Sequence, residues 1–397
     1  MPRSNFRNGH LNAYERHDGS RLSVEIVLPS LPRAGMEIMA CELAKGLVAS
    51  GHKVGVTCLE ETGPLADDLR GAAVDVSLVP CPGARSNFLP HKALVEHLRS
   101  RRCDVLHMHN IWGKASLAGR YAGVLQIVAT MHGLAAGEPW FYESLRWWGA
   151  RYIDCVVAVS EPLRRHLIER TRIPSEKVVM LVNGIDLQRF AAAGRTGLLR
   201  TELGIAPDVP VIGCVARLDP VKNHPMLLRA FKRLLAELPA ARLIIVGEGP
   251  LGSQLQADAS EMDLSGRVSF VGSVADTAPV YREFDVFALG SVSEGTSISI
   301  LEALASGVPV VATAVGGNPA LLAPDCGLLV PSDDDARMAE AIVKVLRDRD
   351  LSDALARRGR ARVASGYSSS SMISAYERLY RSLLGADGQR GVSSCAA

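Results

Sequence analysis

The 397-residue chain lacks four features that would each point to a particular class of protein. Its 44 Lys and Arg residues nearly balance 42 Asp and Glu residues, so it has no basic excess of the kind that binds nucleic acid. No stretch approaches the ~18 uninterrupted apolar residues of a membrane-spanning helix, and residues 1–20 lack the apolar run of a signal peptide. Its eight cysteines stand singly, without a CxxC pair or neighbouring histidines, which excludes a zinc site of ordinary spacing and favours a reducing compartment. We therefore expect a cytoplasmic protein that touches membranes only peripherally.

Two successive series of short apolar strands alternate with helical patterns. The first series begins with LSVEIVL over 22–28, and apolar residues recur on one face of the helix expected over 36–50. The second series begins near Val211. Such alternation is typical of parallel sheets covered by helices. Because 48% of the residues are hydrophobic, the chain can bury two cores, and we predict an α/β protein with two Rossmann-like domains that face a cleft.

The stretch between the two series is rich in Ala, Gly and Pro and poor in strand signals, as a linker is. A helical pattern follows the second series, and the last residues are small and polar. We predict the following segments: a disordered segment over 1–20, a first Rossmann-like domain over 21–190, a linker over 191–210, a second Rossmann-like domain over 211–367, a helix over 368–385 and a disordered tail over 386–397.

The most informative stretch is EGTSISILEALASGVPVVA, which runs from Glu294 to Ala312. It lies between two apolar strands and places Glu294 and Glu302 eight positions apart around the start of a short helix. A helix that starts at the carboxyl edge of a parallel sheet offers free N–H groups and a positive dipole end to phosphate. Carboxylates beside the phosphate accept hydrogen bonds from sugar hydroxyl groups. A nucleotide-sugar contains all of these groups.

Two simpler interpretations of the glutamates remain open. Glu302 could close a capping box that Ser299 begins, although that start leaves only about two helical turns before Gly307. Thr296 or Ser297 is the better cap. Alternatively, both acids are surface charges.

Two cations occur in the sequence ARLDPVKNH. Arg217 follows a strand, and Lys222 comes five residues later, just before Asn223 caps an expected helix. Fixed cations and a helix N-terminus can stabilise a departing diphosphate as a divalent metal otherwise would. The alternative is that both side chains are solvated surface cations.

Two other motifs suggest different chemistry. Gly247 to Gly252 matches the GxGxxG fingerprint of NAD-binding enzymes, but Pro250 falls within the turn and no acid follows at Val271-Gly272. The run Asp333 to Asp335 could suggest a metal-binding DxD motif, yet it precedes an expected helix, where capping is the simpler explanation. We therefore expect neither NAD nor a metal.

Three histidines follow or lie within strands of the first series. His132 ends the strand QIVATMH, which places its imidazole at the carboxyl edge of the sheet, although a lone histidine is more often structural. His107 and His109 alternate along the strand DVLHMH, and we expect only one of them, the second, to face the site.

The stretch from Glu294, together with ARLDPVKN, NGID at 183–186 and GLLVPSDD, resembles the retaining GT-B glycosyltransferases of family 4 (group 1). The resemblance covers residues 22–384, with the motifs in the expected order. It implies transfer of a hexose-type sugar from a nucleoside diphosphate to an acceptor hydroxyl with retained configuration. It also implies that the diphosphate oxygen serves as the base, so that neither a cofactor nor a metal is required.

The same resemblance assigns roles to individual residues. Glu302 would hold the ribose, Glu294 the hexose hydroxyls, and the N–H groups of Gly295 to Ile298 the diphosphate. The first domain would carry the acceptor, and the last helix would cross back onto it. The implied catalytic residues are His132, Glu294, Arg217 and Lys222; the implied donor-binding residues are Gly35, Arg217, Lys222, Gly272, Glu294, Gly295, Thr296, Ser297, Ile298 and Glu302; the implied acceptor-side residues are His109 and Asn110.

The chain departs from the family pattern at three places. Ala34-Gly35 stands where many relatives have two glycines, Ala320 stands where an acid is usual, and Ser297 replaces Gly or Pro. The Ala320 departure indicates that donor preference can differ from that of most relatives.

The partners are less defined than the site. We expect a UDP-sugar as the favoured donor and a GDP-sugar as the alternative. The resemblance implies that the base meets backbone groups near Gly272 and Ser273, which carry no side-chain code, so the sequence does not identify the base. We expect the acceptor to be a glycan or a lipid-linked molecule. Basic residues Arg99 to Arg102 and aromatic residues over 140–148 suggest contact with the inner membrane face, whereas packed tryptophans and a soluble acceptor are the alternative. Two other functions stay open: an inverting GT-B transferase or nucleotide-sugar epimerase, and a non-catalytic regulatory protein that binds sugar nucleotides.

Overall fold

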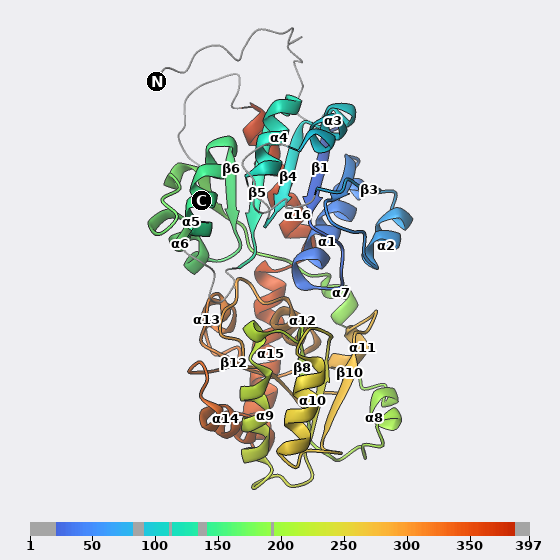
Figure 1. The fold of residues 1–397 in the computed structure, drawn as a ribbon. Coiled ribbons are helices and arrows are strands. Elements are labelled where there is room, and N and C mark those ends of the chain that lie inside the picture. Colours follow the sequence, from blue (N-terminus) through green and yellow to red (C-terminus); the bar gives the residue numbers. More distant parts are fainter. Residues whose placement is uncertain (1–20, 82–90, 111–112, 134–140, 192–193, 386–397) are drawn as a thin grey trace.

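The computed structural model describes residues 21–81, 91–110, 113–133, 141–191 and 194–385. These residues form two parallel β-sheets, each flanked by helices, and the two units lie one above the other in Figure 1. The predicted α/β fold with two Rossmann-like domains is therefore confirmed. The segments 1–20 and 386–397, which we expect to be disordered, lie outside the described residues.

The first sheet has seven described strands, all parallel, in the order β3-β2-β1-β4-β5-β6-β7. Its strands are β1 Ser23–Leu28, β2 Lys53–Cys58, β3 Asp75–Leu78, β4 Val105–His109, β5 Gln126–Met131, β6 Cys155–Ala158 and β7 Val178–Met180. The helices of this part of the chain are α1 Gly35–Ala49, α2 Leu65–Gly71, α3 Lys92–Arg101, α4 Lys114–Ala122, α5 Phe141–Gly149, α6 Glu161–Glu169 and α7 Leu187–Phe190.

The second sheet has six described strands, also parallel, in the order β10-β9-β8-β11-β12-β13. Its strands are β8 Val211–Val215, β9 Arg242–Val246, β10 Val268–Gly272, β11 Val286–Leu289, β12 Val310–Thr313 and β13 Leu328–Val330. The remaining helices are α8 Leu198–Glu202, α9 His224–Leu234, α10 Gly252–Glu261, α11 Ala278–Tyr281, α12 Ile298–Ser306, α13 Asn318–Leu322, α14 Asp335–Arg347, α15 Arg349–Gly366 and α16 Ser369–Gly385.

The central strands are buried along their whole length. Burial on both faces explains why β11 (VFAL) and β12 (VVAT) are almost entirely apolar. In the first sheet, β4 and β5 also carry buried polar side chains, among them His107, His109 and Thr130. The order of the strands reverses between β1 and β4 in the first sheet and between β8 and β11 in the second. Open α/β sheets bind ligands beyond the carboxyl ends of the strands at such switch points. The topology alone therefore points to the loops after β8 and β11.

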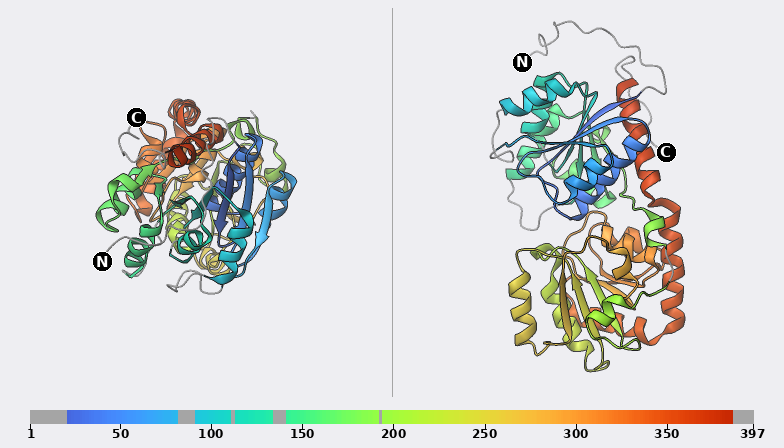
Figure 2. Two further views of the ribbon diagram at one scale, coloured as in Figure 1. Left: turned by 90° about the horizontal axis from the view of Figure 1, so that it is seen from above. Right: turned by 90° about the vertical axis from the view of Figure 1, so that its right-hand side faces the viewer.

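The last helix, α16, packs on the first domain although α15, directly before it, packs on α12 of the second (Figure 2). Gly46 allows a close approach of α1 to α16, because a Cβ at this position would lie 2.1 Å from Ile373 Cδ1. Near the end of the helix, Gln126 Nε2 donates a hydrogen bond to the Leu383 carbonyl oxygen at 3.0 Å. The chain thus runs back to the domain from which it started.

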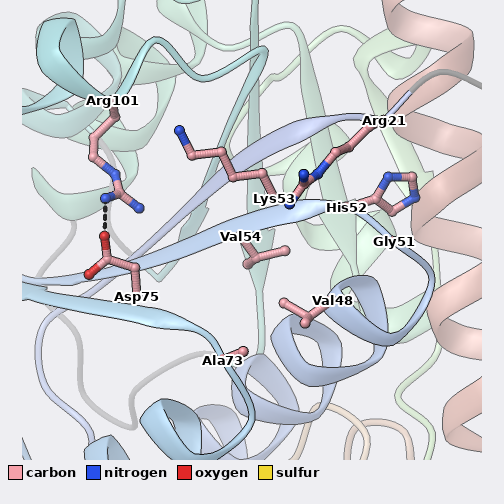
Figure 3. A pocket seen from close by; sticks show the side chains of 9 residues that line it. All are labelled: Arg21, Val48, Gly51, His52, Lys53, Val54, Ala73, Asp75 and Arg101. Atoms are coloured by element: carbon pink, nitrogen blue, oxygen red, sulfur yellow. Dashed lines mark hydrogen bonds and ion pairs between the residues drawn. The ribbon is translucent and has the colours of Figure 1, made fainter.

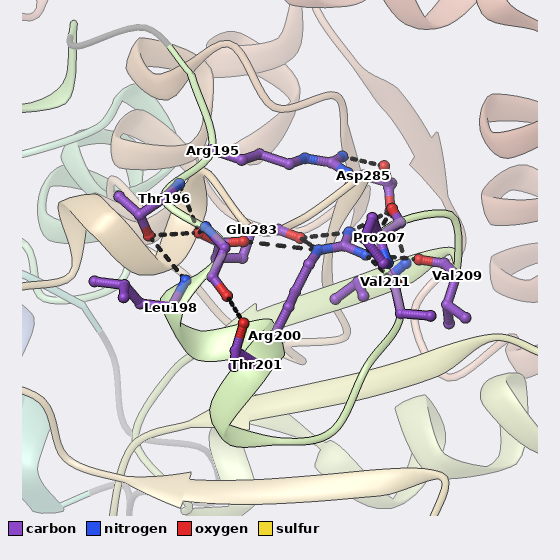
Figure 4. A network of polar contacts seen from close by, with 12 residues as sticks. Arg195, Thr196, Leu198, Arg200, Thr201, Pro207, Val209, Val211, Glu283 and Asp285 are labelled. Atoms are coloured by element: carbon purple, nitrogen blue, oxygen red, sulfur yellow. Dashed lines mark hydrogen bonds and ion pairs between the residues drawn. The ribbon is translucent and has the colours of Figure 1, made fainter.

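The stretch 191–210, which we expect to link the domains, contains α8 and is tied to the second domain by buried polar contacts (Figure 4). Arg200 is 3% exposed. Its guanidinium donates to the Glu283 carbonyl oxygen at 2.8 Å and to Asp285 Oδ2 at 2.9 Å. The Glu283 carboxylate in turn accepts a hydrogen bond from Thr196 Oγ1 at 2.7 Å. These contacts fix this stretch against the second domain.

A cavity of about 250 Å³ opens on the first domain between Arg21, Lys53 and Arg101 (Figure 3). Arg21 precedes β1 and Lys53 begins β2, so the cavity lies at the amino edge of the sheet, opposite the ligand-binding edge. Arg101 is paired with Asp75 and, at 2.7 Å, with the buried Glu25. Its side chain is only 15% exposed, so the prediction that Arg101 belongs to a basic surface is wrong.

Candidate active site

The carboxyl edge of the second sheet brings the predicted donor residues together at its switch point. The loop after β8 carries Arg217 and Lys222, and the loop after the neighbouring strand β11 carries Glu294. The N–H of Val292 donates to the Val221 carbonyl oxygen at 2.9 Å and joins the two loops directly. Residues far apart in the sequence therefore share one site.

Asp219 organises the loop after β8. Its carboxylate accepts hydrogen bonds from the N–H groups of Val221 at 3.1 Å and Lys222 at 3.3 Å, which closes a 3₁₀ turn over Pro220–Lys222. It also accepts from Arg217 Nε at 2.7 Å. The Arg217 side chain stays 60% exposed, whereas that of Lys222 is 22% exposed. The loop therefore holds one cation inside the site and a second near solvent.

Lys222 and Glu294 form an ion pair, with Nζ 2.7 Å from Oε1. The same carboxylate oxygen accepts a hydrogen bond from Ser291 Oγ at 2.7 Å, and the Glu294 side chain is 7% exposed. Because the pair is largely enclosed, salt screens it little. A phosphate that binds Lys222 would therefore directly alter the charge environment of Glu294.

Helix α12 starts directly after the Glu294 loop. Ser297 is the residue that precedes the helix, so a capping box beginning at Ser299 is ruled out. The Ser297 hydroxyl lies 3.2 Å from Ser299 Oγ and makes no capping bond to a backbone N–H. The helix ends before Gly307, whose φ of +72° is the left-handed conformation common after helices. The uncapped start of α12 can receive an anion.

Two glycines pack against the Glu294 loop. A Cβ on Gly316, which has a φ of +51°, would lie 1.7 Å from the Glu294 carbonyl oxygen. A Cβ on Gly317 would lie 2.1 Å from the Gly295 carbonyl oxygen, which accepts a hydrogen bond from Gly317 N at 3.0 Å. Only glycines leave room for this contact between two backbone segments. The Gly316-Gly317 pair therefore sets the position of the loop that holds Glu294.

The same loop also contacts the first domain. A Cβ on Gly295 would lie 2.0 Å from the His132 carbonyl oxygen, and Thr296 Oγ1 donates a hydrogen bond to the Val159 carbonyl oxygen. A Cβ on Gly35 would lie 3.5 Å from Ile298 Cγ1. The predicted residues of both domains thus meet along one seam.

His132 is half-buried, and its ring and backbone are each held by a residue that follows or ends β4. Its Nε2 lies 2.8 Å from His109 Nδ1. Its backbone N–H donates to Asn110 Oδ1 at 3.0 Å. Burial lowers the pKa of His132 to about 4, so the ring is neutral near pH 7. His109 and Asn110, which we predict on the acceptor side, therefore contact His132.

The expectation that His107 and His109 point to opposite faces of their strand is wrong. Their ring centroids are 4.3 Å apart, on the same face of β4. Residues two positions apart in a strand point to the same side of the sheet, and the expectation used the wrong period. His107 lies deeper, where its ring contacts Thr130 and Tyr380, and His109 lies beside His132.

Glu302 lies on α12 and is buried, at 6% exposure. Its Oε2 accepts a hydrogen bond from Thr277 Oγ1 at 3.3 Å. Burial raises the pKa of the Glu302 carboxyl to about 7, an effect that Tyr281 and Arg189 partly offset. Glu302 is therefore no solvated surface charge, and neither is Glu294.

The glycine-rich turn after β9 packs against the Arg217 loop. A Cβ on Gly247 would lie 2.1 Å from the Ala216 carbonyl oxygen, and a Cβ on Gly249 would lie 2.4 Å from that of Leu218. The space that these glycines leave is thus filled by the chain itself. Close by, Gly272 ends β10, and the N–H of Ser273 donates to Glu248 Oε1 at 3.3 Å. Sequence reasoning did not single out Glu248.

The aspartates over 333–335 make contacts that explain them structurally. Asp334 caps α14 by accepting from the N–H of Arg337 at 2.9 Å. Asp333 and Asp335 pair with Arg229 and Arg233. The capping explanation is confirmed. Among the described residues, no group of three or more His, Cys, Asp or Glu side chains is arranged to hold a metal ion.

Ser160 is a further site residue that the sequence analysis missed. It follows β6, and its buried Oγ has no hydrogen-bond partner among the described residues. A Cβ on Gly317 would lie 3.2 Å from Ser160 Cβ, which places the serine beside the Glu294 loop. The serine at the end of the strand CVVAVS, before a helix with proline in its first turn, was the available signal.

Two sequence families match most of the chain. Residues 33–189 match the model of glycosyltransferase family 4, and residues 209–348 match that of glycosyl transferases group 1. A GDP-mannose-dependent monoacylated alpha-(1-6)-phosphatidylinositol monomannoside mannosyltransferase of Corynebacterium glutamicum is 32% identical over 298 residues, which cover 70% of this chain and 76% of that protein. A UDP-Gal:alpha-D-GlcNAc-diphosphoundecaprenol alpha-1,3-galactosyltransferase of Escherichia coli is 27% identical, over 81% of this chain and 87% of that protein.

Solved structures share the fold. The Anabaena protein Alr3699/HepE in complex with UDP-glucose superposes with a TM-score of 0.81 at 20% identity and covers 91% of this chain and 100% of its own. The glycosyltransferase WaaG superposes with a TM-score of 0.73 at 18% identity, over 91% of this chain and 100% of its own. The predicted GT-B architecture is therefore confirmed.

Proposed function

Because this chain belongs to the group 1, family 4 glycosyltransferases, we propose that it is a retaining enzyme that moves a hexose from a nucleoside-diphosphate sugar to an acceptor hydroxyl. The observation that carries this proposal is the ion pair between Lys222 and Glu294 at the switch point of the second sheet. It places a cation for phosphate and an acceptor for hydroxyl groups within 2.7 Å of each other, beside the uncapped start of α12.

These contacts support the donor roles that we propose. Lys222 and the first N–H groups of α12 bind the diphosphate, while Arg217 can turn from Asp219 toward the leaving group because its side chain is 60% exposed. Glu294 accepts hydrogen bonds from the hexose hydroxyls. Glu302, about one turn further along α12 than Ile298, accepts hydrogen bonds from the ribose. Its side chain is buried, so little water competes for these hydrogen bonds.

The proposed reaction uses no nucleophilic carboxylate. The bond between C1 and the diphosphate oxygen breaks, and the acceptor oxygen bonds to C1 from the same face. The acceptor proton passes to the departing diphosphate. The pairing of Glu294 with Lys222 and Ser291 supports a binding role for this carboxylate, because its Oε1 already accepts two hydrogen bonds. Lys222 and Arg217 stabilise the charge on the diphosphate, so we propose that turnover needs no divalent metal.

We propose a UDP-sugar as the donor, with a GDP-sugar as the alternative. The two relatives named above differ in this respect, one by name using GDP-mannose and the other UDP-galactose. A panel of UDP-, GDP- and ADP-sugars, scored for release of nucleoside diphosphate with and without acceptors, tests the donor. Tight binding of a sugar nucleotide without release in any combination would favour the non-catalytic regulatory function instead.

We further propose that the acceptor is lipid-linked and that the first domain rests on an anionic membrane surface. Of the described helices, none combines the length and apolar character needed to cross a bilayer. Arg99 and Arg102 are exposed around the end of α3, and Trp147 is 44% exposed with the guanidinium of Arg151 3.7 Å from its ring centroid. An exposed aromatic ring with a cation over it, as Trp147 has Arg151, and exposed cations elsewhere on the same domain are typical of peripheral binding. Side chains of residues 140–142 lie outside the described residues.

Co-sedimentation with vesicles tests this surface. We expect binding to phosphatidylglycerol vesicles but not to phosphatidylcholine vesicles, with loss at high salt and in the variant Arg99→Glu/Arg102→Glu. The control variant Arg337→Glu, on the second domain, should still bind. Absence of binding at low salt would favour a soluble acceptor.

A further inference from the structure

Three histidines stack between the active-site seam and the helix α16. The ring centroids of His107 and His109 are 4.3 Å apart with the planes tilted by 40°, and those of His109 and His132 are 5.1 Å apart with the planes 20° from parallel. His107 and His109 are buried, whereas His132 at the end of the stack is half-buried. The stack thus connects a buried polar cluster to the residue that faces the site.

The far end of the stack is fixed by hydrogen bonds from two directions. His107 Nε2 lies 2.7 Å from Thr130 Oγ1 of β5, and His107 Nδ1 lies 2.8 Å from the Tyr380 hydroxyl of α16. The Tyr376 hydroxyl, also from α16, lies 3.0 Å from Thr130 Oγ1. Both nitrogens of His107 are therefore occupied, and its ring forms a rigid floor under His109.

The contact between His109 and His132 can hold its proton in two ways. If His132 Nε2 carries the proton, neutral His109 must carry its own on Nε2. That nitrogen is buried without a hydrogen-bond partner among the described residues, so this arrangement leaves a buried N–H unpaired. If His109 Nδ1 carries the proton, only a lone pair on its Nε2 is left unpaired. A buried N–H without a partner is the rarer and costlier defect.

The second arrangement determines the state of His132. Its Nε2 then accepts the hydrogen bond from His109, so the ring proton sits on Nδ1. Nδ1 of His132 makes no hydrogen bond to any described residue. Burial lowers the pKa of His109 and His132, so both rings stay neutral near pH 7 and neither nitrogen gains a second proton.

We propose that His109 is a positioning residue that holds His132 in the Nδ1–H form, so that His132 offers an N–H donor to an oxygen of the transferred sugar. That this N–H donates to the transferred sugar rests on the proposed function. Asn110 holds the backbone of His132 at the same time, at 3.0 Å. The stack on His107 gives α16 a part in the geometry of the site, although α16 follows the second domain in the sequence.

Nitrogen NMR of the full-length, unliganded protein with ¹⁵N-labelled histidine rings tests the tautomer directly. The His132 signals are assigned by their loss in His132→Asn. We expect a protonated Nδ1 and a bare, hydrogen-bonded Nε2 for His132 at pH 7. A protonated Nε2 would overturn the proposal. Because this measurement needs no substrate, its result is independent of whether the proposed transfer reaction is right.

A matched pair of variants tests the consequence. His109→Asn keeps an N–H donor close to the position of Nδ1, whereas His109→Leu removes it. With the donor that turns over in the sugar-nucleotide panel, we expect kcat of His109→Leu to fall about ten- to hundredfold. Its KM and its nucleoside diphosphate affinity should stay within about threefold, and His109→Asn should recover most of the rate. Equal rates in the two variants, both folded as judged by thermal unfolding, would refute a positioning role.

Discussion

Replacing Glu294 and Glu302 by alanine, one at a time, should affect different steps of the reaction. Glu302 is 6% exposed, and among the described residues it forms no ion pair, although Thr277 Oγ1 donates to its Oε2 at 3.3 Å. We assign it to the ribose. Glu294 is bound to Lys222, the residue that we assign to the diphosphate. On the proposed assignment, loss of Glu302 removes a partner of the nucleotide itself, whereas loss of Glu294 removes a partner of the sugar alone.

The structure sets the size of each effect. A hydrogen bond to a charged group contributes about 1.5–3 kcal/mol, and an unsatisfied partner costs about as much. Glu302→Ala should therefore weaken nucleoside diphosphate binding by about 1–3 kcal/mol, or about 5- to 150-fold. Glu294→Ala frees Lys222 Nζ from a contact of 2.7 Å, so the affinity for nucleoside diphosphate should stay the same or rise. Its turnover should fall about 100-fold, because the hexose loses the acceptor that positions its hydroxyl groups.

Calorimetric titration with the nucleoside diphosphate and steady-state release from the donor separate the two effects. The titrations belong at pH 8, where Glu302 is mostly ionised. Glu294→Gln is the matched control, since it removes the charge but keeps an oxygen for the Ser291 hydroxyl, which donates at 2.7 Å in the wild type. Equal losses of nucleoside diphosphate affinity in Glu294→Ala and Glu302→Ala would refute the assignment of sugar and ribose.

Three further predictions follow from the same contacts. Lys222→Ala should lower the rate about 100- to 1000-fold and weaken nucleoside diphosphate binding, and the additional change Glu294→Ala should partly restore that binding. Wild-type turnover should survive EDTA. Loss of turnover in EDTA that magnesium restores would contradict the metal-free mechanism. Because burial raises the pKa of Glu302 to about 7 and ribose hydroxyls favour the ionised form, affinity for a nucleoside without phosphates should rise from pH 6 to pH 8, and Glu302→Gln should show no such rise in calorimetry. Arg200→Met should lower the free energy of unfolding in denaturant by about 3–5 kcal/mol, because it leaves the buried Glu283 without its cation. Arg195→Met should lower it by only about 0–1 kcal/mol, since the Arg195 side chain is 42% exposed. Equal effects would show that burial of the Arg200–Glu283 pair is unimportant.

Much of the fold could be predicted from the sequence because the buried parallel strands are mostly apolar and alternate with amphipathic helical patterns. The helix expected over 36–50 spans Gly35–Ala49, and the pattern over 368–385 gives α16 at Ser369–Gly385. Strand β7 was not expected, since it has only three residues, Val178–Met180, and no period can be read from so few. Short elements at the edge of a sheet depend on their neighbours more than on their own sequence.

The candidate site was predictable as a set of loops but not as a set of contacts. Lys222 and Glu294 are 72 residues apart, and only the adjacency of β8 and β11 brings their side chains together. The role of Gly316 and Gly317 as supports for the Glu294 loop was equally hidden, because it depends on the approach of one backbone to another. The histidine error had a different cause. The residues were visible in the sequence, and the two-residue period of a strand was applied the wrong way.

The return of α16 to the first domain also matters for the order in which the protein is made. Roughly 200 residues separate the end of β7 at Met180 from the end of α16 at Gly385. At 5–20 residues per second, a ribosome needs about 10 to 40 s to add them. During that time the face of the first domain that Tyr380 and Leu383 later cover, including His107 and Gln126, is open to chaperones. The first domain therefore emerges first from the ribosome but is finished last.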